Sequence, residues 1–479
     1  MNKPLKTIMC LLLLSLNSFA LNVSEEKLIE WARSESFNAK KLELEKLNSQ
    51  YNYNAFEDKF QASVQVKYNY LKTKETSFSS FAPITSPIKE AQVILSKPTM
   101  YGVQGSVSAG TSQVSNNFYQ SGTTAKFGAA VAIDLYKDLF GKTTRANQDS
   151  LLIKKEIAKK ESEITTHAYI GQVRKLYWSL VANNESLKIA RELLDTSKKL
   201  EKDTFDRFKN NVADKGELSR TRSQVEARNG QILLLEFERS ELFKRLKEMF
   251  PNKLGSENLS LSSYNLDNTI AEVLACSANI SSKADAPKEY TKYDEVLALL
   301  KQDLRLSKKI NESYSKADLK LVSELNYIGK DFSHSDAIDE LKDSGRQQYA
   351  VGFQLDIPLG NAKKATEEIR DEIIQKSKIS RYQEVEGKLA AFHSQTVNSI
   401  NVLYKVIAAQ KRNSILLDET LKSSKKKFKQ ARLSSRELIQ DEDSLLQSNL
   451  NEINTKYNVI STLIDYFSVF TETPCSINK

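Results

Sequence analysis

One pattern of residues occurs twice in this chain, and it limits the possible folds more than any other feature. The shared positions are an aromatic residue, a lysine, a glutamate and a leucine: Phe208, Lys209, Glu217 and Leu218, which recur 220 positions later as Phe428, Lys429, Glu437 and Leu438. An alternating apolar stretch precedes each copy and ends at Asp134 or Asp356. Each half therefore predicts strands, a long helix, a turn and a returning helix. Neither half has enough strands to close a sheet alone, so a complete sheet requires further chains.

The first twenty residues predict an export signal. Lys3 and Lys6 precede an apolar run from 8 to 16, and Ser18 and Ala20 are small residues at the two positions that a signal peptidase inspects. The run is too short for a stable membrane-spanning helix. We expect 1–20 to be a signal peptide; a buried N-terminal helix is the alternative.

Composition favours long helices and gives no sign of catalysis. The 479 residues include only 8 prolines and 15 glycines. The net charge of +9 fits a lysine-rich helical surface in an exported protein better than a nucleic-acid site. His167, His334 and His393 are too scattered for a metal or catalytic cluster, and nucleophile and phosphate-binding motifs are missing. We expect neither an enzyme nor a cofactor.

Two cysteines, Cys276 and Cys475, would remain after cleavage of the signal. Their spacing does not suit a zinc site. In an oxidising compartment they form either one disulfide, between the middle of the chain and its C-terminal tail, or two free thiols.

Four segments alternate apolar and polar residues with the period of a strand. In the first, Val64 and Val66 share one face, and Gln65 and Lys67 share the other. The strands are expected near 60–71, 123–136, 318–328 and 347–358. Eleven residues is about the length of a tilted transmembrane strand, and the polar faces suit a water-filled lumen.

Two points about these strands stay open. A soluble antiparallel sheet alternates in the same way, although long helical segments separate these strands in pairs. A membrane barrel needs about eight strands or more, and three chains with four strands each would supply about twelve. Residues 99–112 also alternate, and are either an extra strand or part of a long loop between 72 and 122.

The helices predict an unusually long coiled-coil structure. The segment 141–207 lacks proline, and Leu180, Leu187 and Leu194 recur every seven residues. It would form a helix about 100 Å long. A soluble coiled-coil rod, such as a non-transporting envelope scaffold or adaptor, explains the helices equally well but leaves the strands without a role.

These elements divide the chain into two repeats and a connector. The first repeat, 21–250, contains an N-terminal helix, two strands, the helix 141–207, a turn and a return helix 217–250. The second, 290–479, contains a helix, two strands, a long helix 361–427, a turn, a return helix 437–470 and a tail. The connector is 251–289, an equatorial region of short elements.

With this organisation the chain resembles the outer-membrane efflux family, the TolC-like trimeric channel proteins. The resemblance covers essentially the whole mature chain. Pro358-Leu359, after the last strand, is similar to the family's Pro-Leu step into the descending helix, whereas 136–141 resembles a longer connector. The implied fold is mainly α with β: a long α-helical coiled-coil barrel, plus four strands per chain in a trimeric transmembrane β-barrel.

The resemblance singles out the two helix turns as sites for docking an adaptor. The candidates are Phe208, Asn211, Leu218, Phe428, Ala431 and Leu438. Family members have glycine where this chain has Asn211 and Ala431. Because asparagine tolerates a left-handed backbone, we expect the first turn to be preserved, and we expect Ala431 to give a different second turn.

What the family implies is a homotrimeric, passive export duct in the outer membrane of a Gram-negative-type cell, contacting outer-membrane lipid and extending into the periplasm. Its partners would be a periplasmic adaptor (membrane fusion protein) and an inner-membrane pump, in tripartite efflux or type I secretion. By position, Glu217, Glu437, Asp441 and Asp443 would line the periplasmic aperture and attract cations. They are otherwise ordinary acids at helix starts, favoured by the helix dipole.

Overall fold

The structure is a computed structural model. It describes residues 21–34, 36–75, 86–115, 122–254, 259–262, 264–282, 292–314, 316–357 and 361–470. The expected signal peptide, Pro358-Leu359 and Cys475 lie outside these residues. The chain forms two compact units: a sheet unit, Leu44–Glu161 with Glu295–Glu386, and a helical unit containing the remainder.

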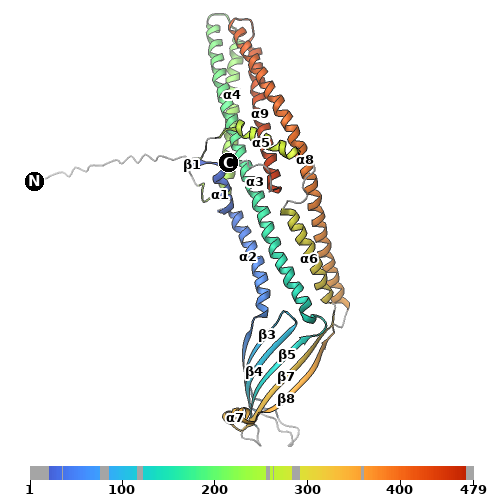
Figure 1. Ribbon diagram of the computed structural model, residues 1–479. Helices are drawn as coiled ribbons and strands as arrows, with labels where there is room; N and C mark the ends of the chain where they lie inside the picture. Colours follow the sequence, from blue (N-terminus) through green and yellow to red (C-terminus); the bar gives the residue numbers. More distant parts are fainter. Residues whose placement is uncertain are drawn as a thin grey trace, which may run out of the picture. The chain divides into compact units, whose positions relative to one another are not determined.

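Six strands form one antiparallel sheet in the sheet unit (Figure 1). In order across the sheet they are β2 (Ser63–Leu71), β3 (Ile88–Pro98), β4 (Val103–Val114), β5 (Gly122–Asp134), β7 (Asp318–Asp331) and β8 (Arg346–Asp356). The expectation of four strands is wrong. Residues 99–112 belong largely to β4, and one more strand, β3, pairs with β4. The sequence signal of β3 is weak because Ile88 and Ile94 lie on its polar face.

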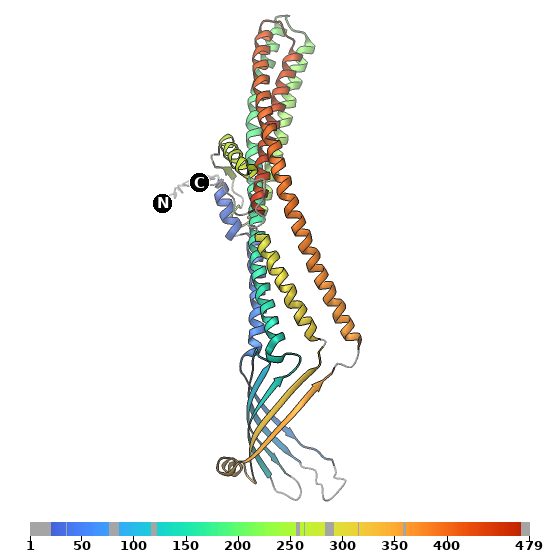
Figure 2. The ribbon, with the colours of Figure 1, turned by 45° about the vertical axis from the view of Figure 1, so that its right-hand side comes forward.

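The two faces of the sheet differ in chemistry from edge to edge. One row of directly paired residues on the apolar face is Val64, Leu95, Val107, Ala129, Leu325 and Tyr349. The adjacent row on the opposite face is Gln65, Ile94, Ser108, Gly128, Asn326 and Gln348. Much of the apolar face is uncovered, and Tyr349 is 83% exposed. Figure 2 shows the strands side by side in one layer.

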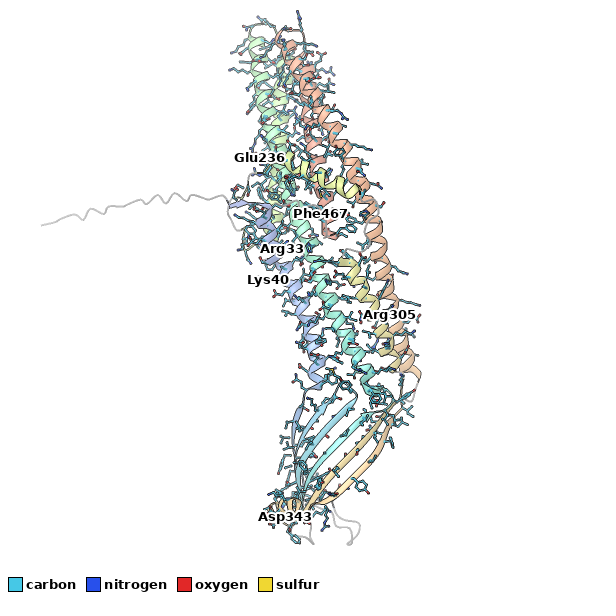
Figure 3. The ribbon with its side chains drawn as sticks, in the orientation of Figure 1. Arg33, Lys40, Glu236, Arg305, Asp343 and Phe467 are labelled. Carbon is cyan, nitrogen blue, oxygen red and sulfur yellow. The ribbon has the colours of Figure 1, made fainter. Side chains whose placement is uncertain are left out.

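A short helix that the sequence did not suggest, α7 (His334–Ser344), connects β7 and β8. Ser333 begins it, and its hydroxyl accepts a hydrogen bond from the amide of Asp336. The helix lies against Gly329, where a Cβ atom would stand 2.2 Å from the carbonyl oxygen of Ala337. Figure 3 labels Asp343 on this helix, at one end of the strands.

At the other end of the sheet, the turn between β3 and β4 fits closely against the connector that leads into the long helix α3. The amide of Asp134 donates to the carbonyl of Gly102 at 2.9 Å. Gly141 has a φ of +69°, and a Cβ atom there would lie 1.7 Å from the carbonyl oxygen of Met100. The connector then begins α3 through Asp138, whose carboxylate accepts from the amide of Thr143 at 2.7 Å.

The predicted long helices are confirmed. The four are α3 (Lys142–Lys209), α4 (Lys215–Met249), α8 (Asn361–Lys429) and α9 (Ser435–Val469), with lengths of 68, 35, 69 and 35 residues. Residues of α3 and α8 belong to both units. The shorter helices include α6 (Lys292–Tyr314) and two where one was expected, α1 (Glu25–Ser34) and α2 (Phe37–Glu57). Ser36 separates them, because its hydroxyl caps α2 through the amide of Ala39.

The main hydrophobic core lies in the helical unit. It joins α1, α3, α4, α8, α9 and the helix α5 (Leu266–Ser282), with a two-stranded parallel sheet of β1 (Leu21–Val23) and β6 (Leu259–Leu261) beside it. Glu25 is held in this core region, because its carboxylate accepts from Arg174 Nε at 2.5 Å and Trp178 Nε1 at 3.1 Å. Cys276 is buried and disulfide-bonded. Its pairing with Cys475 stays a prediction.

None of the helices in the described part of the chain combines the length and apolar character needed to cross a membrane.

We predict that Gly141→Ala destabilises the protein by more than about 2 kcal/mol, because it combines a left-handed backbone with a steric overlap. Chemical unfolding in detergent would measure this. Gly105→Ala, in β4, is the matched control, since no atom lies within 4 Å of its added methyl group. Equal stability of the two variants would contradict the fit between the β3–β4 turn and the connector.

Candidate functional site

The two helix turns lie beside each other in the helical unit (Figures 1 and 2). One joins α3 to α4, and the other joins α8 to α9. Ser435, at the start of α9, donates its hydroxyl to Glu217 Oε1 in α4 at 3.5 Å. The sequence motif that occurs twice therefore brings its two copies together at one end of this unit.

The two turns have the same backbone geometry. Asn211 and Ala431 have φ values of +56° and +55°. The amides of both residues donate to the carbonyl three positions earlier, at 3.0 Å to Phe208 and 2.9 Å to Phe428. The expectation of a different second turn is wrong: Ala431 adopts the left-handed backbone at a cost of about 1–2 kcal/mol.

Side-chain caps fix where the return helices begin. Asp214 accepts from the amide of Glu217 at 2.7 Å. Ser434 accepts from the amide of Glu437 at 3.3 Å, and the Glu437 carboxylate accepts from the amide of Ser434 at 3.2 Å, which completes a capping box. Glu437, an aperture candidate, therefore also has a local structural role.

The docking candidates divide into exposed and buried side chains. Phe208, Asn211 and Ala431 are exposed. Leu218, Phe428 and Leu438 are buried; the Phe428 ring packs among leucines and lies 4.6 Å from the Arg207 guanidinium. In the single chain the exposed apolar surface at the turns thus comes from Phe208 together with Val212, which is 62% exposed. Sequence reasoning missed Val212, although an apolar residue in a surface turn is itself a signal.

The remaining aperture candidates lie on α9. Asp443 is exposed and links α9 to α4, because its Oδ1 accepts from Arg228 at 2.5 Å and from Gln224 Nε2 at 2.8 Å. Asp441 is half-buried. The structure thus places Glu217 and Glu437 in the first turns of α4 and α9, and Asp441 and Asp443 within the next two turns of α9. Glu217 and Asp443 form contacts between these helices.

Glu442, between Asp441 and Asp443, is fully buried. Three consecutive acidic residues, 441–443, are by default a solvated or lumen-facing charge run, but the structure buries Glu442. Its Oε2 accepts from Ser197 of α3 at 3.5 Å, and its Oε1 lies 3.7 Å from Lys425 Nζ of α8. Burial raises the pKa of Glu442, whereas the charges of Lys425 and Arg228 and the Ser197 hydrogen bond act in the opposite direction, and Asp443 raises it further.

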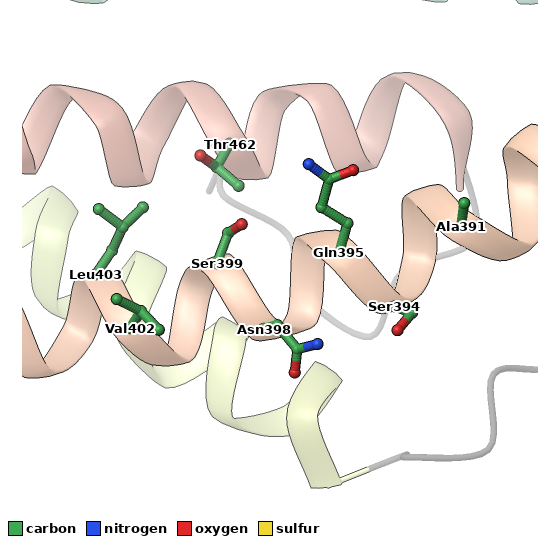
Figure 4. A pocket seen from close by; sticks show the side chains of 8 residues that line it. All are labelled: Ala391, Ser394, Gln395, Asn398, Ser399, Val402, Leu403 and Thr462. Carbon is green, nitrogen blue, oxygen red and sulfur yellow. The ribbon is translucent and has the colours of Figure 1, made fainter.

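A hollow of about 830 Å³ in the helical unit lies on α8 and α9. Its lining residues are Ala391, Ser394, Gln395, Asn398, Ser399, Val402, Leu403 and Thr462 (Figure 4). None of these side chains titrates, so the hollow offers no general acid, base or charged ligand group. Within the described residues, no group of histidine, cysteine and acidic side chains could hold a metal ion.

Comparison with known proteins identifies the fold. No family model and no curated protein matches the sequence. Among solved structures, the outer membrane protein VceC of Vibrio cholerae is similar, with a TM-score of 0.67 and 14% identity over 94% of this chain and 97% of that chain. The Campylobacter jejuni CmeC outer membrane channel has a TM-score of 0.64 and 12% identity, covering 93% of this chain and 84% of that chain.

A third similar structure is the open state of the Neisseria gonorrhoeae MtrE outer membrane channel. Its TM-score is 0.63 at 14% identity, over 93% of this chain and 88% of that one. The chain therefore has the fold of TolC-like outer-membrane channel proteins, as the sequence predicted.

Replacing Ala431 with glycine should stabilise the chain by about 1 kcal/mol, because glycine adopts a positive φ without penalty. Asn211→Gly is the control, with a gain below about 0.5 kcal/mol, since asparagine tolerates this backbone better. Thermal melting of both variants measures the difference. A lower melting temperature for Ala431→Gly would show that the second turn has another geometry.

Glu442 should make stability depend on pH. Because its folded pKa is raised above the ordinary 4.5, the folded chain binds this proton more tightly than the unfolded chain. Its contribution to stability is therefore present at and below the ordinary carboxyl range and is lost as pH rises through the folded pKa. Glu442→Gln should remove that loss, as measured by unfolding between pH 4 and pH 8.

Glu226→Gln, an exposed position on α4, is the control for this experiment and should leave the pH dependence as in the wild type. If Glu442→Gln also left the dependence of stability on pH unchanged, Glu442 would not be buried in solution.

Proposed function

We propose that this chain is the outer-membrane channel component of an export system, a passive duct assembled from three copies in a Gram-negative-type cell. Each chain would consist of two repeats, and each repeat would contribute strands to a transmembrane barrel and a long helical pair to a periplasmic tunnel. A periplasmic adaptor and an inner-membrane pump would complete a tripartite efflux or type I secretion system.

The two-faced sheet is the observation that carries this proposal. Its apolar side chains are large and uncovered on the central strands as well as at the edges, with Val107, Phe127 and Leu325 each more than 40% exposed. Leaving such side chains in water costs about 1.5–3 kcal/mol each relative to full burial. A lipid environment on the apolar face and water on the polar face remove this cost, and a closed barrel pairs the backbone groups as a membrane requires.

The helices fit the same function. Helices of 68 and 69 residues, each followed by an antiparallel return helix of 35, are far longer than an ordinary core requires. A scaffold could use such helices, but it has no use for a sheet with a lipid-compatible face. The similarity in fold to the outer membrane channels CmeC and MtrE adds weight to the channel over the scaffold.

Membrane extraction and reconstitution test the function. The protein should stay with outer membranes during washing with high salt and require detergent for release, and in planar bilayers it should give long-lived conductance steps. Release by salt alone, without conductance, would instead indicate a peripheral scaffold.

At the turns, we propose that Glu217, Glu437, Asp441 and Asp443 face the periplasmic aperture of the assembled channel. Six carboxylates from the first two positions, in three copies, would then favour cations. The exposed Phe208 and Val212 would offer an apolar surface to the adaptor.

Glu437→Gln is a clean test, because glutamine can replace glutamate in a capping box while removing the charge. We expect lower cation selectivity of the reconstituted channel and an unchanged melting temperature. Glu226→Gln serves as the control. Unchanged conductance and selectivity in Glu437→Gln would exclude Glu437 from the aperture.

A further inference from the structure

The sheet has two strands more than a TolC-like chain is expected to contribute, and they form its second and third positions. β3 and β4 contain 11 and 12 residues, close to the length of a tilted transmembrane strand. All residues of β3 pair with β4, and nine of them also pair with β2. β4 pairs along its full length with β5. The hairpin is therefore inserted into the sheet rather than attached to one edge.

The side chains of the hairpin continue the chemistry of the other strands. A second row on the apolar face is Val66, Val93, Ala109, Phe127 and Tyr327, in which Val93 and Ala109 belong to the hairpin. On the polar face, Glu90 accepts a hydrogen bond from Asn69 of β2 at 3.4 Å. A hairpin that folded away from the wall would interrupt both faces.

The backbone of the hairpin is also closely packed, between its two strands and at its turn. At Gly110 in β4, a Cβ atom would lie 2.7 Å from the carbonyl oxygen of Ala91 in β3. The turn between the two strands is held against the start of α3 at Gly102 and Gly141, and the Tyr101 ring lies 5.7 Å from the Arg145 guanidinium. The turn end of the hairpin is thus fixed by contacts within the sheet unit.

The edges of the sheet indicate how copies join. In the described part of the chain, β2 and β8 each pair on one side only, and all residues of both strands are exposed. Their free edges carry unpaired backbone groups that a membrane does not tolerate. Because six antiparallel strands alternate in direction, β2 and β8 run in opposite directions. β8 of one copy therefore meets β2 of a second copy as an antiparallel pair, and head-to-tail repetition closes a ring.

We propose that β3 and β4 are full strands of the barrel wall, and that β8 of each copy pairs with β2 of the next. In the trimer of the proposed function, on which this inference rests, six strands per chain give a wall of eighteen strands. With strands about 4.8 Å apart and tilted by about 40°, the backbone diameter is about 36 Å, against about 24 Å for twelve strands. The hairpin thus widens the outer-membrane passage and admits bulkier cargo at that end.

Cysteine pairs within one row of the apolar face distinguish a wall that contains β3 and β4 from a wall in which β2 pairs directly with β5. Val66→Cys with Val93→Cys, and Ala109→Cys with Phe127→Cys, should each form a disulfide under mild oxidation, because each pair is directly opposed. Val66→Cys with Phe127→Cys is the control: three strand spacings, about 14 Å, prevent a bond. Cross-linking of the control pair, without cross-linking of the first two, would mean that β2 pairs directly with β5 and that the hairpin lies outside the wall.

The joint between copies is tested by combining Val351→Cys on β8 with Val64→Cys, Val66→Cys or Tyr68→Cys on β2. One register should give a ladder of covalent species that ends at the trimer. A cross-link confined to one chain would contradict head-to-tail pairing, as would failure of all three combinations.

Electron cryomicroscopy of the unmodified assembly counts the strands without any substitution. Eighteen would confirm the inference, and twelve would refute it while leaving the proposed channel intact. A protein that is released from membranes by salt and forms no ring would refute the proposed function itself.

Discussion

Pairing of backbone hydrogen-bond groups is the interaction on which this structure depends. In the sheet unit the strands satisfy one another from β2 to β8, but among the described residues the two outer edges remain open, and one face is apolar. A sheet of this kind in water would invite aggregation. In the barrel that we propose, the same features are favourable, because copies share their edges and lipid covers the apolar face.

In the helical unit, the contacts between helices must hold long helices in one register. Its main core supplies the apolar packing, whereas the region near the turns adds polar links between helices: Asp443 with Arg228, Ser435 with Glu217, and the buried Glu442 near Lys425 and Ser197. Apolar packing tolerates sliding, but a buried carboxylate near a specific partner does not. These links therefore specify how α3, α4, α8 and α9 align.

The sequence was informative where periodicity is strong. Uninterrupted heptad-like spacing predicted the long helices, and complete alternation in β2 and β8 predicted strands with the correct faces. It failed at β3, where isoleucines on the polar face weaken the alternation, and at α7, a short helix between two strands. The sequence could not show that Glu442 is buried, since three consecutive acidic residues look solvated until the helix phase and its neighbours are known.

Ala431 shows that the propensity of a single residue does not determine the geometry of a turn. Its propensity argued against a left-handed turn, but the caps and the packing of Phe428 and Leu438 fix the backbone on both sides and outweigh the local cost. Asn211, for which propensity and geometry agree, was predicted correctly. Compartment and cysteine count left Cys276 either paired with Cys475 or free; the structure has Cys276 in a disulfide, and Cys475 as its partner stays a prediction.

In the proposed barrel, the apolar face of the sheet lies in lipid and its polar face in water. Labelling of single cysteines along β8 with a water-soluble maleimide, in intact outer membranes, measures this orientation. We expect strict alternation, with Gln348→Cys, Ala350→Cys and Gly352→Cys labelled and Tyr349→Cys, Val351→Cys and Phe353→Cys protected. Equal labelling of both faces, or protection of the polar one, would contradict it.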